Sequence, residues 1–150
     1  MTLVDEPFDG PTAAALIAEV QREYIVRYGG HDEAPVDAAE FAAGRGGAFI
    51  VALAGGVPVG CVGLRRHDAA MAEIKRMYVR ANDRRRGLGR VLLRAAEERA
   101  RLLGYARVLL ETGTRQPEAI ALYTSDGYLP LAGFGHYHGH PGSRAFAKDL

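Results

Sequence analysis

The order of apolar segments between residues 48 and 111 restricts the fold more than any other feature of this chain. The apolar run Ala48–Leu53 is followed by Ala54-Gly55-Gly56 and then by Val57–Leu64, which predicts a β-hairpin with a glycine turn. A third strand is expected over Ala72–Val79, after a short loop. Because short connections join these three strands, we expect them to form an antiparallel meander.

The segment after the meander predicts a helix and then a strand that is parallel to the one before it. Residues 87–103 carry an apolar stripe at helical spacing, and Glu97 with Arg101 is expected to form an exposed i,i+4 pair. Ala106–Glu111 has a fully apolar centre, which is typical of a buried strand. Because a helix connects it to Ala72–Val79, we expect these two strands to be parallel.

The remaining segments complete an α+β sandwich around one mixed sheet. A helix is predicted over residues 11–28, ended by Gly29-Gly30, and a short second helix over residues 36–43. Another helix begins at Pro117 and ends at Gly127, and two short strands close the chain. No linker, repeat or low-complexity segment divides residues 1–150, so we expect a single domain.

Composition excludes several classes of protein. A chain of 150 residues with 48% apolar and 25% charged residues can bury a core without disulfides or metal. The one cysteine, Cys61, lies in an apolar strand and is expected to be a buried, inert thiol. Apolar runs such as Ala13–Ala18 are too short to span a membrane, and residues 1–6 do not resemble a signal peptide. We therefore expect a cytoplasmic protein.

The charges are distributed unevenly along the chain. Residues 1–64 contain nine acidic and three basic side chains, whereas residues 65–115 contain fourteen basic and six acidic ones. A basic segment of this size indicates a local anionic ligand, while nucleic-acid binding would need a wider basic face and aromatic side chains among the charges. The acidic first part would suit a cationic second ligand, although a solvated acidic surface is the commoner interpretation.

The segment Arg80–Arg90, between the third strand and the following helix, carries the clearest functional signal. Gly87 and Gly89 allow the backbone to approach a ligand closely, and the first-turn N–H groups of a helix attract anions. No Gly-Lys-Ser/Thr follows, so this is not a nucleoside-triphosphate loop. From these residues alone, a phosphate site and a plain tight loop with solvated arginines remain alternatives.

The same segment resembles a motif of the GNAT N-acetyltransferase superfamily. Arg84-x-x-Gly87-x-Gly89 matches the family pattern Gln/Arg-x-x-Gly-x-Gly/Ala between a strand and a helix, and Glu73–Val79 looks like the family's fourth strand. Ala119–Tyr123 with Gly127-Tyr128 and the tail from Pro130 to Lys148 also look like a small, single-domain bacterial member. The resemblance implies a mostly antiparallel sheet, with helices on both faces and one parallel strand pair splayed around the cofactor.

The resemblance implies that the chain binds acetyl-CoA, with no metal. Backbone N–H groups of the loop would hold the pyrophosphate, and the fourth strand would pair with the pantetheine. The N–H of Met77 or Val79 would then polarise the thioester carbonyl. Ala81, Arg85 and Gln116 depart from the common proline, glycine and asparagine. The residues expected to bind the cofactor are Met77, Tyr78, Val79, Arg84, Arg85, Arg86, Gly87, Leu88, Gly89, Arg90 and Gln116.

Two residues are candidates for catalysis by resemblance. Tyr123 matches the tyrosine that protonates the leaving thiolate, although its position also suits a core aromatic residue. Glu73 lies where some members place a general base, and strand alternation would put it on one face with Met77 and Val79. An ion pair of Glu73 with Lys75 or an arginine is an equal alternative.

The resemblance implies transfer of the acetyl group to a primary amine, whose identity the sequence leaves open. Tyr24, Arg27 and Tyr28, at the end of the first helix, are candidates to line its pocket, with no nucleic-acid or membrane partner expected. A homodimer is left open, as is a rival function as a CoA-binding sensor without catalysis. His136, His138 and His140 alternate in sequence, but the glycines around them favour a loop over a metal site.

Overall fold

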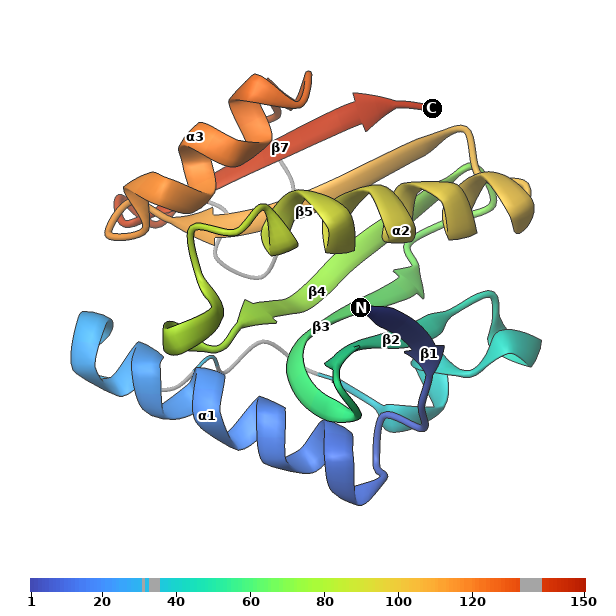
Figure 1. The fold of residues 1–150 in the computed structure, drawn as a ribbon. Helices are drawn as coiled ribbons and strands as arrows, with labels where there is room; N and C mark the ends of the chain where they lie inside the picture. The colour runs from blue at the N-terminus through green and yellow to red at the C-terminus, as the bar shows by residue number, and fades with distance from the viewer. Residues whose placement is uncertain (31, 33–35, 133–138) are drawn as a thin grey trace.

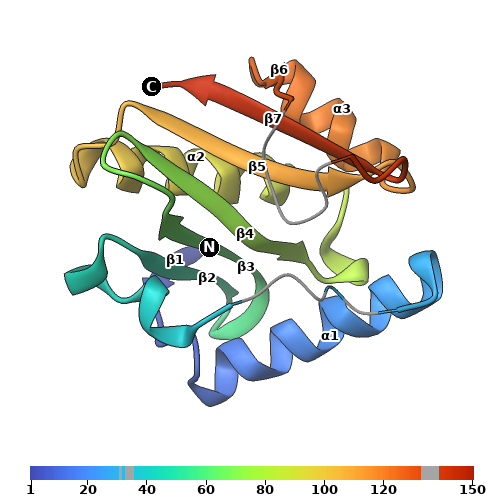
Figure 2. The ribbon, with the colours of Figure 1, turned by 180° about the vertical axis from the view of Figure 1, so that it is seen from behind.

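The computed structural model describes residues 1–30, 32, 36–132 and 139–150, which form one seven-stranded sheet with helices on both faces (Figures 1 and 2). The strands lie in the order β1-β2-β3-β4-β5-β7-β6. The helices are α1 (Pro11–Tyr28), α2 (Leu88–Leu102) and α3 (Pro117–Ser125), with 3-10 turns at Ala38–Phe41 (η1), Ala43–Arg45 (η2) and Ala81–Asp83 (η3). The strands are β1 (Thr2–Asp5), β2 (Ala48–Ala54), β3 (Val57–Arg66), β4 (Met71–Val79), β5 (Arg107–Gly113), β6 (Leu129–Pro130) and β7 (Ser143–Asp149).

The sheet topology confirms the predicted mixed sheet. The strands β2, β3 and β4 form the antiparallel meander, and β5 pairs in parallel with β4 from Met71↔Arg107 onward. Every other pairing, including that of β5 with β7, is antiparallel. The predicted helix at residues 87–103 agrees with α2 within one residue at each end.

Both faces of the sheet are covered, which explains the continuous apolar sequence of β2. Ile50 and Ala52 pack in the core beneath α2 and α3, whereas Phe49 and Val51 pack in the core beneath α1. Because neighbouring residues of a strand point to opposite faces, a strand between two cores must be apolar at each position. Figure 2 shows α1 on the opposite side of the sheet from α2.

Two expectations about local structure are corrected. Residues 36–43 do not form an α-helix; the chain makes the two 3-10 turns η1 and η2, the first closed by a capping box of Asp37 and Glu40. Glu97 is not on the exposed face of α2. It is 2% exposed, accepts a hydrogen bond from Tyr128 Oη at 2.8 Å and pairs with Lys148 at 3.0 Å.

No helix among the described residues is both long and apolar enough to cross a membrane.

The helix α1 is attached to the strand β3 and to the segment after β4 through Glu19 and Arg80. The Arg80 guanidinium donates to both Glu19 carboxylate oxygens, at 2.7–3.1 Å, and to Pro58 O at 2.7 Å. These hydrogen bonds lower the pKa of Glu19 below its ordinary 4.5. A carboxyl with a lowered pKa stabilises the folded state above its unfolded-state pKa and loses that contribution as the pH falls through the folded-state pKa.

We predict that Glu19→Gln lowers the free energy of unfolding near neutral pH by about 1 kcal/mol, the typical worth of a partly buried charge-assisted pair. The difference from the wild type should shrink as the pH falls through the lowered pKa of Glu19, where its carboxylate becomes protonated. Urea denaturation at neutral pH and in acid measures this. Glu98→Gln is the matched control, since Glu98 pairs with Arg101 on the exposed side of α2. An equal loss at both pH values would contradict the assignment.

Candidate functional site

The strands β4 and β5 separate part-way along their length. Their parallel ladder ends at Ile74↔Leu110. On its other side β4 remains paired with β3 as far as Val79, and β5 remains paired with β7 as far as Gly113. Each half of the sheet therefore keeps its own strand pairing up to the opening. Between the two halves, the facing edges of β4 and β5 are unpaired and available to a ligand.

A β-bulge lies on β4 where it leaves β5. Arg76 has a φ of 56°, and the β3–β4 register shifts so that Arg76 and Met77 together lie opposite Val62. The added residue turns Met77 and Val79 toward the core beneath α2 and α3, with which both pack. The expectation that Glu73 shares their face is therefore wrong, because strict alternation fails at the bulge.

The bulge is held from both sides by buried groups. The side chains of Lys75 and Arg76 are 8% and 6% exposed, and both form ion pairs with Asp32 Oδ2, the Lys75 Nζ contact measuring 3.2 Å. The Cys61 thiol donates to Arg76 O at 3.3 Å. Burial raises the pKa of the Cys61 thiol to about 12, which agrees with its interpretation as an inert core residue.

The direction of the backbone after the bulge places two N–H groups toward the opening. Arg80 N donates to Val59 O of β3 at 2.9 Å. Because successive residues of an extended strand direct their N–H groups to alternate sides, those of Val79 and Met77 point away from β3, toward the separated edge of β5. These are the two N–H groups that the sequence analysis assigned to the thioester carbonyl.

The start of α2 forms an anion-binding cradle. Gly87 is the N-cap residue with a φ of 79°, and it supplies no side chain to the N–H groups of Leu88, Gly89 and Arg90. Nothing lies within 4 Å of a Cβ built on Gly87, so the space above this turn is open. Arg85 has a φ of 64°, a left-handed conformation that glycine adopts more easily and that costs an L-residue roughly 1–2 kcal/mol.

The arginines of this loop have different surroundings. Arg84 turns inward, donating to Glu23 Oε2 at 2.6 Å and to Val79 O at 2.9 Å, with its guanidinium 5.7 Å from the Tyr78 ring centroid. Its observed role is thus to join the loop to α1.

The other arginines of the loop surround the N-terminus of α2. Arg90 pairs with Asp126 at 3.1 Å, beyond the end of α3. Arg85 and Arg86 are exposed, and Arg86 lies 3.8 Å from Asp83. Arg85 and Arg86 are therefore the side chains best placed to contribute charge to an anion at this turn.

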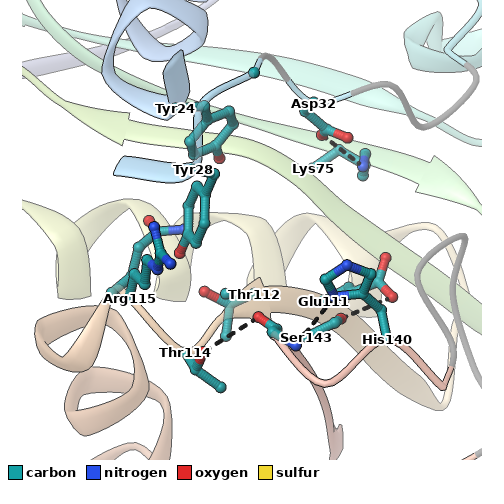
Figure 3. Close-up of a pocket in the computed structure, with 14 residues that line it drawn as sticks. Tyr24, Tyr28, Asp32, Lys75, Glu111, Thr112, Thr114, Arg115, His140 and Ser143 are labelled. Carbon is teal, nitrogen blue, oxygen red and sulfur yellow. Dashed lines mark hydrogen bonds and ion pairs between the residues drawn. The ribbon is translucent and has the colours of Figure 1, made fainter. Parts of the chain in front are cut away.

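A pocket of about 360 Å³ opens beside the separated strands. Figure 3 shows Tyr24 and Tyr28 with the Asp32–Lys75 pair along one side and Glu111 on the other. It is lined by Tyr24, Tyr28, Gly30, Asp32, Lys75, Glu111, Thr112, Gly113, Thr114, Arg115, Gln116, His140, Gly142 and Ser143. The structure thus brings together Tyr24 and Tyr28, which were expected at the acceptor pocket, and Gln116, which was expected to bind the cofactor.

Arg27, the third residue expected at the acceptor pocket, does not line it. Its guanidinium pairs with Glu23 at 3.1 Å and with Glu118 at 2.8 Å, and donates to Arg115 O at 3.1 Å. Arg115 donates in return to Arg27 O at 2.7 Å. Arg27 therefore connects the end of α1 to the start of α3 beside the pocket.

Close packing at Gly113 sets the position of Tyr28 in the pocket wall. A Cβ built on Gly113 would lie 1.9 Å from the Tyr28 hydroxyl oxygen. Only glycine leaves room for the tyrosine at this point of β5.

Tyr123 lies on α3, 6% exposed, between Tyr128 and Phe146 with ring centroids 5.8 and 6.3 Å away. Burial raises the pKa of the Tyr123 phenol above its ordinary 10.0, and the nearby Tyr24 adds to this shift. The phenol is therefore protonated at neutral pH and available as a hydrogen-bond donor.

The two glutamates near the separation of the strands differ in their surroundings. Glu73 is paired with Arg65 at 2.8 Å, Arg65 also contacts Glu40 at 3.4 Å, and none of the three lines the pocket beside β5. Glu111 does line it and accepts a hydrogen bond from Ser143 Oγ at 3.1 Å. Sequence reasoning missed Glu111, although its place directly after the apolar run of β5 was an available signal.

The histidines give no metal site within the described ranges. His136 and His138 lie outside them. His140 lines the pocket, and its Nδ1 accepts from Gly142 N at 3.0 Å. No group of three or more His, Cys, Asp or Glu side chains within residues 1–30, 32, 36–132 and 139–150 could hold a metal ion.

Comparison with known proteins identifies the family. The sequence profile described as the acetyltransferase (GNAT) family matches residues 14–128. The chain belongs to the GNAT acetyltransferase family. It is 38% identical over 103 residues to an IAA acetyltransferase of Azospirillum brasilense, a match covering 68% of this chain and 67% of that protein.

Further GNAT proteins are similar over different extents. N-acetyltransferase 8 of Homo sapiens is 38% identical over 89 residues, but the chain spans only 39% of its length. A candidate acyl-CoA N-acyltransferase of Klebsiella pneumoniae has the same fold with a TM-score of 0.80, 29% identity and coverage of 99% and 97% of the two chains. A GNAT acetyltransferase of Elizabethkingia anophelis with acetyl-CoA bound, 17% identical, shares the fold with a TM-score of 0.70 over 99% of this chain and 97% of that one.

We predict that Gly89→Asp weakens CoA binding at least about 100-fold, because it places a carboxylate beside the N–H groups where the pyrophosphate would bind. Gly89→Asn is the matched control, since it has the same shape without the charge and meets the same neighbour, Leu122 Cδ2, at 3.1 Å from Cβ. Calorimetric titration with CoA measures both. Equal CoA affinities of Gly89→Asp and the wild type would show that this loop does not bind the cofactor.

Proposed function

We propose that this protein transfers the acetyl group of acetyl-CoA to a primary amine by direct attack within a ternary complex. The observation that carries the proposal is the separation of β4 from β5 beside the open N-terminus of α2. Family membership supports acyl transfer in general, and the GNAT neighbour with acetyl-CoA bound supports this cofactor.

The described residues fit an acetyl-CoA molecule. The N–H groups from Arg85 to Arg90 would hold its pyrophosphate, with open space above Gly87 and charge from Arg85 and Arg86. The exposed edge of β4 from Met77 to Val79 would pair with the pantetheine amides. Gln116, at the N-cap of α3 and in the pocket lining, would reach the same chain.

The chemistry needs a polarised carbonyl, a neutral amine and a protonated leaving group. The N–H of Met77 or Val79 would donate to the thioester oxygen, where negative charge develops during attack. The amine nitrogen forms the new C–N bond, the C–S bond breaks, and the CoA thiolate takes up a proton. Tyr123 is the proposed donor of that proton, because it matches the tyrosine that protonates the leaving thiolate in the family.

For the base, the surroundings favour Glu111 over Glu73. The amine must approach through the pocket, which Glu111 lines and Glu73 does not. The Glu73 carboxylate is already paired with Arg65. We therefore propose that Glu111 accepts a proton from the incoming ammonium group, while Glu73 stabilises the packing of β3 on β4.

The direct test of the function is calorimetric titration with acetyl-CoA, followed by measurement of thiol release with a panel of amines. Binding with thiol release on one class of amine is the expected result. Lack of acetyl-CoA binding would overturn the proposal. Binding without turnover on any amine would favour the rival function as a CoA-responsive sensor.

We predict that Tyr123→Phe lowers kcat about 10- to 100-fold with little change in acetyl-CoA affinity, because it removes the proton donor and keeps the ring. Tyr105→Phe is the matched control, since the Tyr105 hydroxyl donates to Gly46 O at 2.6 Å, away from the pocket. Steady-state kinetics and calorimetry measure the two effects. An unchanged kcat would remove Tyr123 from the mechanism.

We predict that Glu111→Gln lowers kcat/KM about 100-fold near neutral pH and removes the acidic limb of the pH–rate profile. Glu73→Gln should retain that limb and instead lower the midpoint of thermal unfolding, because it leaves the partly buried Arg65 without its closest carboxylate. The opposite pattern, with the limb lost only in Glu73→Gln, would return the base role to Glu73.

A further inference from the structure

The bulge of β4 carries more positive charge than its surroundings neutralise. The ammonium of Lys75 and the guanidinium of Arg76 share a single carboxylate, that of Asp32. Among the described residues, no other carboxylate lies within ion-pair distance of either cation. Arg76 Nε is also buried without a hydrogen-bond partner among them. Counted over the described residues alone, the cluster of Lys75, Arg76 and Asp32 therefore has one excess positive charge.

An excess charge at this depth is costly. The three side chains are 8%, 6% and 13% exposed, so water solvates them poorly. Removing a charge from water without a full partner destabilises the folded protein, and a bound anion would offset that cost. Lys75 lines the pocket, so an anion entering the pocket could reach its Nζ.

The opposite side of the pocket carries the complementary charge. Ile74↔Leu110 is the last pair of the parallel ladder, and Lys75 and Glu111 are the next residues on their strands. Both line the pocket, and Figure 3 shows them on its two sides. A positive and a negative group thus flank the place where the thioester would lie.

We infer that the acceptor is a free amino acid, whose carboxylate binds Lys75 and whose amine lies beside Glu111. This inference rests on the proposed acetyl transfer. Glu111 takes a proton from the ammonium group, and the neutral amine nitrogen bonds to the acetyl carbon. The C–S bond breaks with the thiolate protonated by Tyr123, and the second proton lost from the amine nitrogen, as the amide forms, restores the Tyr123 phenol. The products are an N-acetyl amino acid and CoA.

The same contacts argue against a purely cationic acceptor. The acidic residues of the first part of the chain are largely paired with the basic middle, so they do not form an open anionic surface. The pairs are Asp5–Arg99, Glu19–Arg80, Glu23–Arg84, Asp32 with Lys75 and Arg76, and Glu40–Arg65. The cationic second ligand that the charge distribution would suit therefore loses its basis.

The test compares amino acids with amines that lack only the carboxylate, such as tyrosine with tyramine and ornithine with putrescine. Dipeptides, in which the amine and the carboxylate are farther apart, form a third arm. At least one amino acid should exceed its decarboxylated partner in kcat/KM about 100-fold, the usual effect of losing a charge-assisted contact. Lys75→Met should abolish that ratio, with acetyl-CoA affinity unchanged.

A stability measurement separates recognition from a structural role. Lys75→Met leaves one cation, Arg76, on Asp32, so its unfolding midpoint should equal or exceed that of the wild type. Proteinogenic amino acids added with CoA should raise the midpoint of the wild type but not of Lys75→Met. Arg107→Met is the charge-matched control, because Arg107 pairs with Asp149 at the far end of β5.

The outcomes distinguish this inference from the function on which it rests. Thiol release that is equal or faster with the decarboxylated amines or the dipeptides would overturn the amino-acid acceptor and leave acetyl transfer intact. Absence of acetyl-CoA binding would overturn both. If acetyl-CoA binds without turnover, the midpoint of thermal unfolding in the presence of CoA and amino acids is the deciding measurement. The inference would be overturned if no amino acid raised this midpoint, or if the rise were equal in the wild type and in Lys75→Met.

Discussion

The separation of β4 from β5 is the constraint on which the rest of the structure depends. A strand with unpaired edges inside a sheet is unstable unless its other edge is fully held. Here β3 holds β4 as far as Val79, and β7 holds β5 as far as Gly113. The bulge at Arg76 directs β4 away from its neighbour, and the buried contacts of Asp32 and Cys61 hold the bulge in place. The unpaired edge of β4 from Met77 to Val79, the pocket, and the positions of Lys75 and Glu111 all follow from this one opening.

The uneven charge distribution of the chain has a structural explanation. Among the described residues, five of the nine acidic residues before position 65, namely Asp5, Glu19, Glu23, Asp32 and Glu40, form ion pairs with basic residues of the segment 65–115. Most of these pairs join α1 and its flanking segments to β4 and to the loop after it. Charges that suggested two ligands of opposite sign thus largely serve to attach one layer of the domain to the other. Arg85 and Arg86 at the helix start and the excess at Lys75 are local positive charges outside these pairs.

The sequence was sufficient to predict most of the helices and strands, but not β1, the 3-10 turns after α1 or the irregularities within strands. The meander, α2 and the parallel strand follow from hydrophobic periodicity and glycine positions, which report burial directly. The bulge was not predictable, because an arginine in the left-handed conformation leaves no signal in the pattern of apolar and polar residues. The sequence therefore placed Met77 and Glu73 on the same face of β4, which is wrong. Glu97 looked like an exposed helix residue, since its partners Tyr128 and Lys148 come from distant segments. Glu111 was missed for the same reason: the pocket exists only once β5, β7 and α1 are assembled.

The packing of Tyr28 against Gly113 bears on how such a domain can change during evolution. The tyrosine forms part of the pocket wall only because position 113 carries no side chain. Any other residue at position 113 displaces the Tyr28 ring. Gly113 does not have a positive φ, so the backbone conformation itself would accept another residue. One codon can therefore reshape the acceptor side of the pocket while the bulge and the start of α2 stay as they are. Under the proposed function, a substitution at position 113 changes the acceptor pocket and leaves the cofactor site as it is.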